Sequence, residues 1–183
     1  MNLLLIGARA SGKTTVGRHL ARISRLRFVD LDDRVQAMFP EDSVTEIWTV
    51  HGEPAWRVAE TRALESVLAE EDQVVALGGG TPMIPAARSL IEHARRTGRA
   101  RVLYLRCTPG ELARRLEHAA GDRPSLTGDD PAAEVAAVLA ARSDTYEALA
   151  DVVYDGDDAA AAIARLCAEE REAEEGSGSA GRK

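Results

Sequence analysis

The stretch GARASGKTT, residues 7–15, constrains the fold of this chain more than any other segment. It follows the apolar run NLLLI and fits the pattern G-x-x-x-x-G-K-S/T between a predicted strand and a predicted helix. In that setting, successive backbone N–H groups and the positive end of the helix bind phosphate oxygens. The sequence therefore predicts an α/β domain with a nucleotide site near its N-terminus.

The loop residues receive specific expected roles. We expect the phosphates of a nucleotide to be bound by Gly7, Ala8, Arg9, Ala10, Ser11, Gly12, Lys13, Thr14 and Thr15. Such a loop alone serves GTPases, ATPases and small-molecule kinases, so other features must decide among them. Lys13 would bring positive charge to the β- and γ-phosphates, and the Thr14 hydroxyl would ligate Mg²⁺. Ala10 is comfortable only if its φ is negative, because a positive φ costs alanine roughly 1 kcal/mol. Such strain would loosen the loop without abolishing it. The alternative is an ordinary glycine-containing turn.

Hydrophobic patterning predicts strands alternating with helices. The strands are expected at residues 3–6, 28–31, 73–77, 101–105 and 152–154. The helices are expected at residues 13–24, 45–50, 55–68, 85–96, 109–118, 131–149 and 159–170, with Gly52 and Pro54 separating the second from the third. This alternation is typical of a parallel sheet covered by helices on both faces, and the first strand, which is apolar throughout, is expected at its centre.

The length of 183 residues fits one domain, expected over residues 1–170 with a polar loop at 119–130. Residues 171–183 are rich in charge, Gly and Ser, so we expect a disordered tail. The net charge of -7 disfavours nucleic acid as a partner. No apolar run reaches the roughly 20 residues that span a bilayer, and NLLLI is too short for a signal peptide. We expect a cytoplasmic monomer.

The metal-binding residue types give weaker signals. The cysteines Cys107 and Cys167 lie in apolar contexts and are expected to be buried free thiols rather than a disulfide or a zinc site. The four histidines lack the spacing of metal ligands. The cysteines and histidines therefore predict no metal site of their own.

Two carboxylates follow the second predicted strand. Asp30 and Asp32 would lie at the carboxyl end of the sheet, where ligands bind in open parallel sheets. If both continue the strand, alternation places them on one face. One can help to hold Mg²⁺ through water, and the other can accept a proton from a substrate hydroxyl. The alternative is that they cap the following helix.

Further candidates are a glycine triplet and several arginines. Gly78, Gly79 and Gly80 end the third strand and would let a ligand approach bare backbone, although a tight turn is the alternative. Arg57 shares a helix face with Glu60, which can orient it; the alternative is a surface ion pair.

In order and spacing, six motifs resemble those of the shikimate kinase family. They are GARASGKTTVG, FVDLDD, GEPAWRVAET, VVALGGG, DRPSLTG and ARSDTYEALAD, and the resemblance covers about residues 2–167. DRPSLTG looks most like the lid of the type II enzymes. One departure is Ala10, where the family usually has glycine.

The resemblance implies a fold and a reaction. The fold is the three-layer P-loop kinase fold, with a five-stranded parallel sheet in the order 2-3-1-4-5. The reaction is transfer of the γ-phosphoryl group of ATP to the 3-hydroxyl of shikimate, a step of the pathway to chorismate and the aromatic amino acids.

The resemblance also implies roles for individual residues. Asp32 would bind ring hydroxyls and act as base, and Asp30 would lie near Mg²⁺. Arg57 and Arg142 would clamp the substrate carboxylate, with the glycine triplet beside the ring. Arg123 would close over the ATP phosphates from the lid. Trp48 and Trp56 would wall the pocket.

Two other functions stay open at this point. A sugar-acid kinase of the gluconate type would also need cations for a carboxylate and a base for a hydroxyl. A nucleotide-binding module without catalysis would keep the loop and act through a partner protein.

Overall fold

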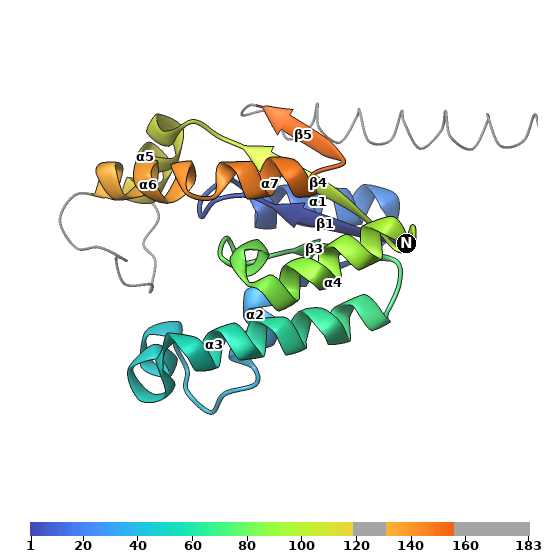
Figure 1. Ribbon diagram of the computed structural model, residues 1–183, viewed down its shortest axis with the longest axis horizontal. Coiled ribbons are helices and arrows are strands. Elements are labelled where there is room, and N and C mark those ends of the chain that lie inside the picture. Colours follow the sequence, from blue (N-terminus) through green and yellow to red (C-terminus); the bar gives the residue numbers. More distant parts are fainter. Residues whose placement is uncertain (119–130, 156–183) are drawn as a thin grey trace, which may run out of the picture.

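The computed structural model describes residues 1–118 and 131–155, which form a five-stranded sheet with helices on both faces (Figure 1). All neighbouring strands are parallel, in the order β2-β3-β1-β4-β5. This order and the layered architecture confirm the predicted fold. The strands are β1 Asn2–Ile6, β2 Arg27–Asp30, β3 Gln73–Ala76, β4 Ala100–Arg106 and β5 Val152–Asp155.

The helices lie on both sides of the sheet. They are α1 Lys13–Ser24, α2 Leu31–Gln36, α3 Val44–Ala69, the short 3-10 helix η1 Thr81–Met83, α4 Pro85–Arg96, α5 Pro109–His118, α6 Pro131–Ala140 and α7 Ser143–Leu149. Side chains of α1 pack on one face of the sheet, whereas those of α3, α4 and α7 pack on the other.

The central position of β1 in the sheet explains why its sequence is apolar. Leu3 and Leu5 of β1 pack into the core beneath α1, and Leu4 and Ile6 pack into the core beneath α3 and α4. Because successive side chains of a strand point to opposite faces, a strand buried on both faces must be apolar throughout. The run NLLLI therefore occupies the middle of the sheet, as predicted.

The structure corrects the prediction at three element boundaries. The helix expected over residues 131–149 is two helices, α6 and α7, with a turn at residues 141–142. The strand expected to end at Leu31 ends at Asp30, and Leu31 begins α2, a helix that the pattern did not delimit. The predicted break between residues 50 and 55 is a kink inside α3, where Gly52 has a φ of 77°.

Several expectations concern residues outside the described part of the chain. These are the loop at residues 119–130 with Arg123, the helix at residues 159–170 with Cys167, and the tail at residues 171–183. Within the described ranges, no helix combines the length and the apolar character needed to cross a membrane.

Candidate functional site

The phosphate loop lies at the topological switch point of the sheet. The central strand β1 has β3 on one side and β4 on the other, and the loop leaves its carboxyl end. Open α/β sheets form their ligand crevice at this position. Gly7 and Gly12 have φ values of 144° and 94°, which other residues adopt at a cost, so these two glycines fix the course of the loop.

The side chain of Lys13 points back toward the start of the loop. Its Nζ donates to the carbonyl oxygens of Gly7 at 3.0 Å and Ala8 at 2.7 Å. Gly12 is the N-cap of α1 with no side chain to cap it, so the first N–H groups of this helix have no side-chain acceptor at the cap. An ammonium group and a helix N-terminus in one loop make a site for an anion.

Ala10 adopts the unfavourable conformation that the sequence left open. Its φ is 63°, in the left-handed region. An L-residue with a Cβ pays roughly 1 kcal/mol there relative to glycine. Arg115 of α5, which the sequence analysis did not single out, donates from Nη1 to the carbonyl oxygen of Ala10 at 3.3 Å and to Sγ of buried Cys107 at 3.4 Å. The first of these contacts ties the backbone of the strained residue to α5.

Thr14 and Asp30 meet beside the loop. The Thr14 hydroxyl donates to Asp30 Oδ2 at 2.9 Å, and burial is the largest of several causes that raise the pKa of the Asp30 carboxyl. A hydroxyl and a carboxylate next to a phosphate site are oxygen ligands of the kind that Mg²⁺ uses together with waters and phosphates. The residues therefore fit a nucleotide-bound magnesium ion, with no dedicated cluster of acidic ligands within the described residues.

Asp30 also caps α2, which is the alternative that the sequence offered for it. Its Oδ1 accepts from the backbone N–H of Asp32 at 3.2 Å. Asp32 lies in the first turn of α2 and not on the strand, so the expectation that strand alternation aligns the two carboxylates is wrong. The helical turn, not the pleat, directs Asp32 into the neighbouring cavity.

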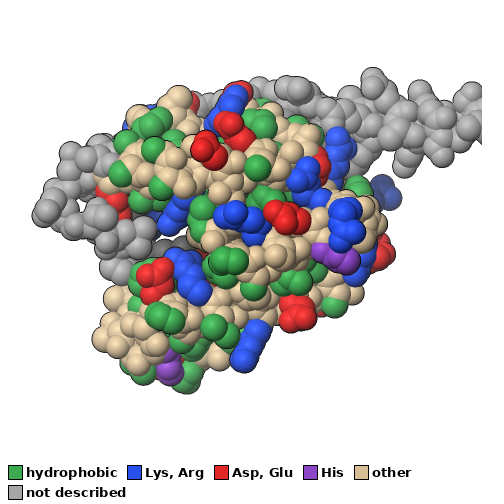
Figure 2. All heavy atoms as spheres, viewed as in Figure 1, with side chains coloured by type: hydrophobic (Ala, Val, Ile, Leu, Met, Phe, Trp, Pro, Cys, Tyr) green, Lys and Arg blue, Asp and Glu red, His purple; other side chains and the backbone are tan. Residues whose placement is uncertain are grey.

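One cavity gathers all six residues predicted to bind substrate. Its volume is about 80 Å³, and its lining consists of Arg9, Asp32, Val44, Trp48, Trp56, Arg57, Glu60, Gly78, Gly79, Gly80 and Arg142. Space-filling spheres show a recess between α3 and the surface of α6 and α7 (Figure 2). Arg9, predicted as a phosphate-loop residue, thus also lines this cavity. Three arginines, an aspartate, a glutamate and two tryptophans thus line one cavity, from segments far apart in the chain.

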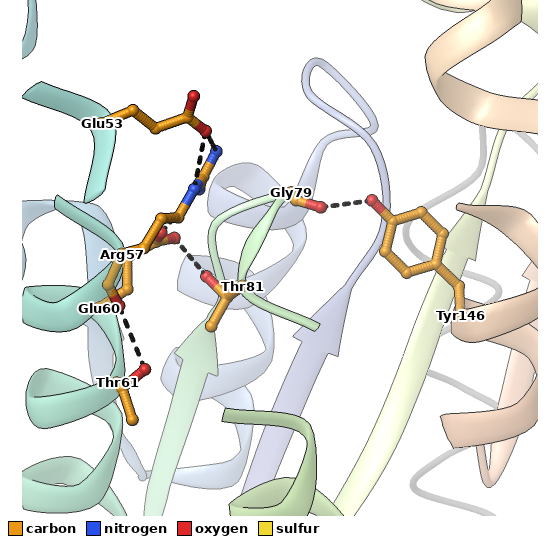
Figure 3. A network of polar contacts seen from close by, with 7 residues as sticks. All are labelled: Glu53, Arg57, Glu60, Thr61, Gly79, Thr81 and Tyr146. Atoms are coloured by element: carbon orange, nitrogen blue, oxygen red, sulfur yellow. Dashed lines mark hydrogen bonds and ion pairs between the residues drawn. The ribbon is translucent and has the colours of Figure 1, made fainter. Parts of the chain in front are cut away.

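Arg57 is the centre of a polar network (Figure 3). Its Nη1 donates to Glu60 Oε2 at 2.6 Å, and its Nη2 donates to Glu53 Oε1 at 2.6 Å. Glu60 is only 1% exposed, and its other oxygen accepts from the Thr81 hydroxyl at 2.6 Å. Burial is the main cause that raises the pKa of Glu60, against the lowering effect of Thr81 and Arg57. The pair predicted from sequence is therefore buried on its glutamate side and is no surface ion pair.

The glycine triplet is required by the protein's own groups as well as by any ligand. A Cβ on Gly78 would lie 2.7 Å from Asp32 Oδ1 and 2.8 Å from Glu60 Oε1. A Cβ on Gly80 would lie 2.6 Å from Arg57 Nη1, and one on Gly79 would lie 3.3 Å from Gly7 O in the phosphate loop. The sequence offered ligand approach or a tight turn as reasons for the triplet, and the structure adds another: glycine lets these side chains and the phosphate loop come close.

The break between α6 and α7 positions Arg142. Arg142 has a φ of -120° and is the N-cap of α7, and it lines the same cavity as Arg57. One turn later, the Tyr146 hydroxyl donates to Gly79 O at 2.5 Å, which ties α7 to the triplet (Figure 3). Tyr146 and Thr81 were missed as site residues. Tyr146 stands within the motif ARSDTYEALAD, which was the available signal for it.

A second cavity of about 530 Å³ lies between β4, α5, α6 and α7. Its lining includes Tyr104, Cys107 and Leu139 and contains none of the residues predicted to bind nucleotide, metal or substrate. The smaller cavity is therefore the candidate substrate site because of the groups that line it and not because of its size.

Comparison with known proteins gives a consistent result. The family model described as shikimate kinase matches residues 9–172. A protein named shikimate kinase from Oleidesulfovibrio alaskensis is 42% identical over 88% of this chain and 92% of its own length. One named shikimate kinase 2 from Sodalis glossinidius is 39% identical over the same shares.

Solved structures agree with the sequence relatives. The shikimate kinase of Acinetobacter baumannii in complex with shikimate has a TM-score of 0.81 and 26% identity, covering 91% of this chain and 90% of that one. The shikimate kinase of Bacteroides thetaiotaomicron has a TM-score of 0.78 and 28% identity, covering 91% of this chain and 96% of that one.

Proposed function

The chain belongs to the shikimate kinase family, and we propose that it transfers the γ-phosphoryl group of ATP to the 3-hydroxyl of shikimate. One observation carries this proposal: Arg57, Arg142 and Asp32 line one cavity. Gly79, from the same lining, approaches the phosphate loop closely enough that a Cβ on it would lie 3.3 Å from Gly7 O. Acceptor and donor sites would therefore adjoin.

The cavity suits a small ring acid with hydroxyl groups. Arg57 and Arg142 would bind its carboxylate, since guanidinium–carboxylate pairs combine charge with fixed geometry. Trp48 and Trp56 would cover the apolar part of the ring. Asp32 would accept hydrogen bonds from ring hydroxyls and take the proton of the attacking one, with its carboxylate held at the start of α2.

Phosphoryl transfer needs positioning and neutralisation of charge more than covalent help. Lys13 and the backbone N–H groups of residues 7–15 would hold the β- and γ-phosphates of ATP. Mg²⁺, when held by Thr14 and water-linked Asp30, supplies positive charge to the phosphate oxygens. Arg123 would add a further cation over the phosphates and help to exclude water, which would otherwise compete with the ring hydroxyl.

A panel of acceptors with the purified protein tests this function. ADP release is followed with shikimate, with gluconate and with no acceptor, for the natural chain and for Asp32→Asn. We expect ADP release with shikimate alone and a loss of orders of magnitude in Asp32→Asn. Turnover with gluconate would support the sugar-acid kinase, and ATP binding without turnover on any acceptor would support the inactive module.

We further propose a cytoplasmic monomer that binds neither nucleic acid nor membrane.

A further inference from the structure

Arg57, the cation that we assign to the substrate carboxylate, already has two carboxylate partners on its own helix (Figure 3). Its Nη1 donates to Glu60 Oε2 at 2.6 Å. Its Nε and Nη2 both donate to Glu53 Oε1, at 3.0 and 2.6 Å. A ligand carboxylate would thus be the third negative group around a single guanidinium.

The two glutamates differ in how firmly they are held. Glu60 is 1% exposed and accepts from the Thr81 hydroxyl on its second oxygen, so it is fixed in place. Glu53 is 50% exposed and lies next to the kink at Gly52. Exposed ion pairs between neighbouring helical residues are worth little, because water solvates the separated charges well. Glu53 can therefore leave Arg57 at low cost, whereas Glu60 cannot.

We infer that Glu53 is a specificity-determining residue that competes with the substrate carboxylate for Arg57. This inference rests on the proposed function of Arg57 as a substrate ligand. When the acid binds, Glu53 either moves into water or stays and repels the incoming carboxylate. In both cases its negative charge opposes the binding of an anion at this position.

The competition affects different ligands unequally. An anion that reaches only Arg57 replaces one carboxylate by another and gains little. An acid whose carboxylate also reaches Arg142, another lining residue of the cavity, gains a second guanidinium. Glu53 thereby makes tight binding depend on both arginines and disfavours small anions that contact one of them.

The test is isothermal titration calorimetry of the full chain with shikimate, comparing the natural sequence with Glu53→Gln. Glutamine keeps the size and the acceptor oxygen but removes the charge. We expect the Kd for shikimate to fall about threefold to fivefold, the scale of an exposed charge pair. Glu65→Gln is the matched control, since it removes an exposed glutamate farther along α3 and should leave the Kd unchanged.

Shikimate methyl ester, which lacks the negative charge, provides a second control. Its Kd should be equal in the natural chain and in Glu53→Gln. If the natural chain binds shikimate but Glu53→Gln binds it equally or more weakly, the inference is overturned and the proposed function stands. If the natural chain neither binds nor phosphorylates shikimate, the proposed function fails and this inference fails with it.

Discussion

Replacing Gly80 by alanine tests how Arg57 is placed. The new Cβ would lie 2.6 Å from Arg57 Nη1 and 3.1 Å from both Cζ and Nη2. Gly80 has a φ of -89° and a ψ of -18°, which alanine adopts without strain. The backbone therefore has no reason to shift, and the guanidinium, at the end of a flexible side chain, must move instead.

The size of the effect follows from the contacts of Arg57. Its bond to Glu60 is 2.6 Å long, so a displacement that relieves the new contact spoils this orienting bond as well as the position of the guanidinium in the cavity. A lost hydrogen bond between charged groups costs about 1.5–3 kcal/mol. We therefore expect the affinity for shikimate to fall by roughly 10- to 150-fold in Gly80→Ala.

Steady-state kinetics with shikimate and with ATP, together with thermal unfolding, separate this effect from a general loss of structure. The KM for shikimate should rise while the KM for ATP stays near that of the natural chain, and the Tm should fall only by the few degrees that the spoiled Arg57–Glu60 bond costs. Gly110→Ala is the matched control, because a Cβ at Gly110 meets no atom within 4 Å. An unchanged KM for shikimate in Gly80→Ala would refute the assigned position of Arg57.

Three further variants test separate parts of the site. Lys13→Ala should lower turnover by orders of magnitude with the fold intact by circular dichroism, since the phosphate cation is lost; a near-normal rate would remove the loop from the reaction. Ala10→Gly should raise the free energy of unfolding by up to about 1 kcal/mol and tighten ATP binding, because φ is 63°; equal stability in urea would mean that the alanine is unstrained. Arg57→Ala should weaken shikimate binding by about 1.5–3 kcal/mol and leave ATP binding nearly unchanged in calorimetry; an equal loss for both ligands would contradict the carboxylate clamp.

The parts of the fold that the sequence predicted are those governed by local pattern. The glycine-lysine loop and the apolar strand before it define a strand–loop–helix unit without help from distant residues. The alternating strands and helices then require a parallel sheet. The strand order, by contrast, was implied by the family resemblance, because periodicity says nothing about which strands are neighbours.

The predicted element boundaries were wrong where one helix or strand ends and the next begins within a residue or two. The side chain of Asp30 caps α2, so the strand ends one residue earlier than its apolar pattern indicates. The break before α7 comes just ahead of Ser143, Asp144 and Thr145, residue types that favour helix starts and turns over helix interiors. That local signal was overlooked in the prediction of one helix over residues 131–149.

In the candidate site, too, some contacts could be predicted from local sequence and others depend on the fold. The pairing of Arg57 with Glu60 follows from helical spacing and is confirmed by the geometry. The third member, Thr81, comes from the turn after the glycine triplet, and only the fold brings it to Glu60. The reason for three successive glycines is likewise tertiary, since each one faces a different neighbour.

A crystal structure of the full chain with ADP and shikimate tests the central claim most directly. Our account predicts the ring in the cavity between α3 and α7, its carboxylate contacting both Arg57 and Arg142, and a ring hydroxyl between Asp32 and the phosphate loop. Shikimate bound elsewhere, or bound here with its carboxylate turned away from both arginines, would contradict it.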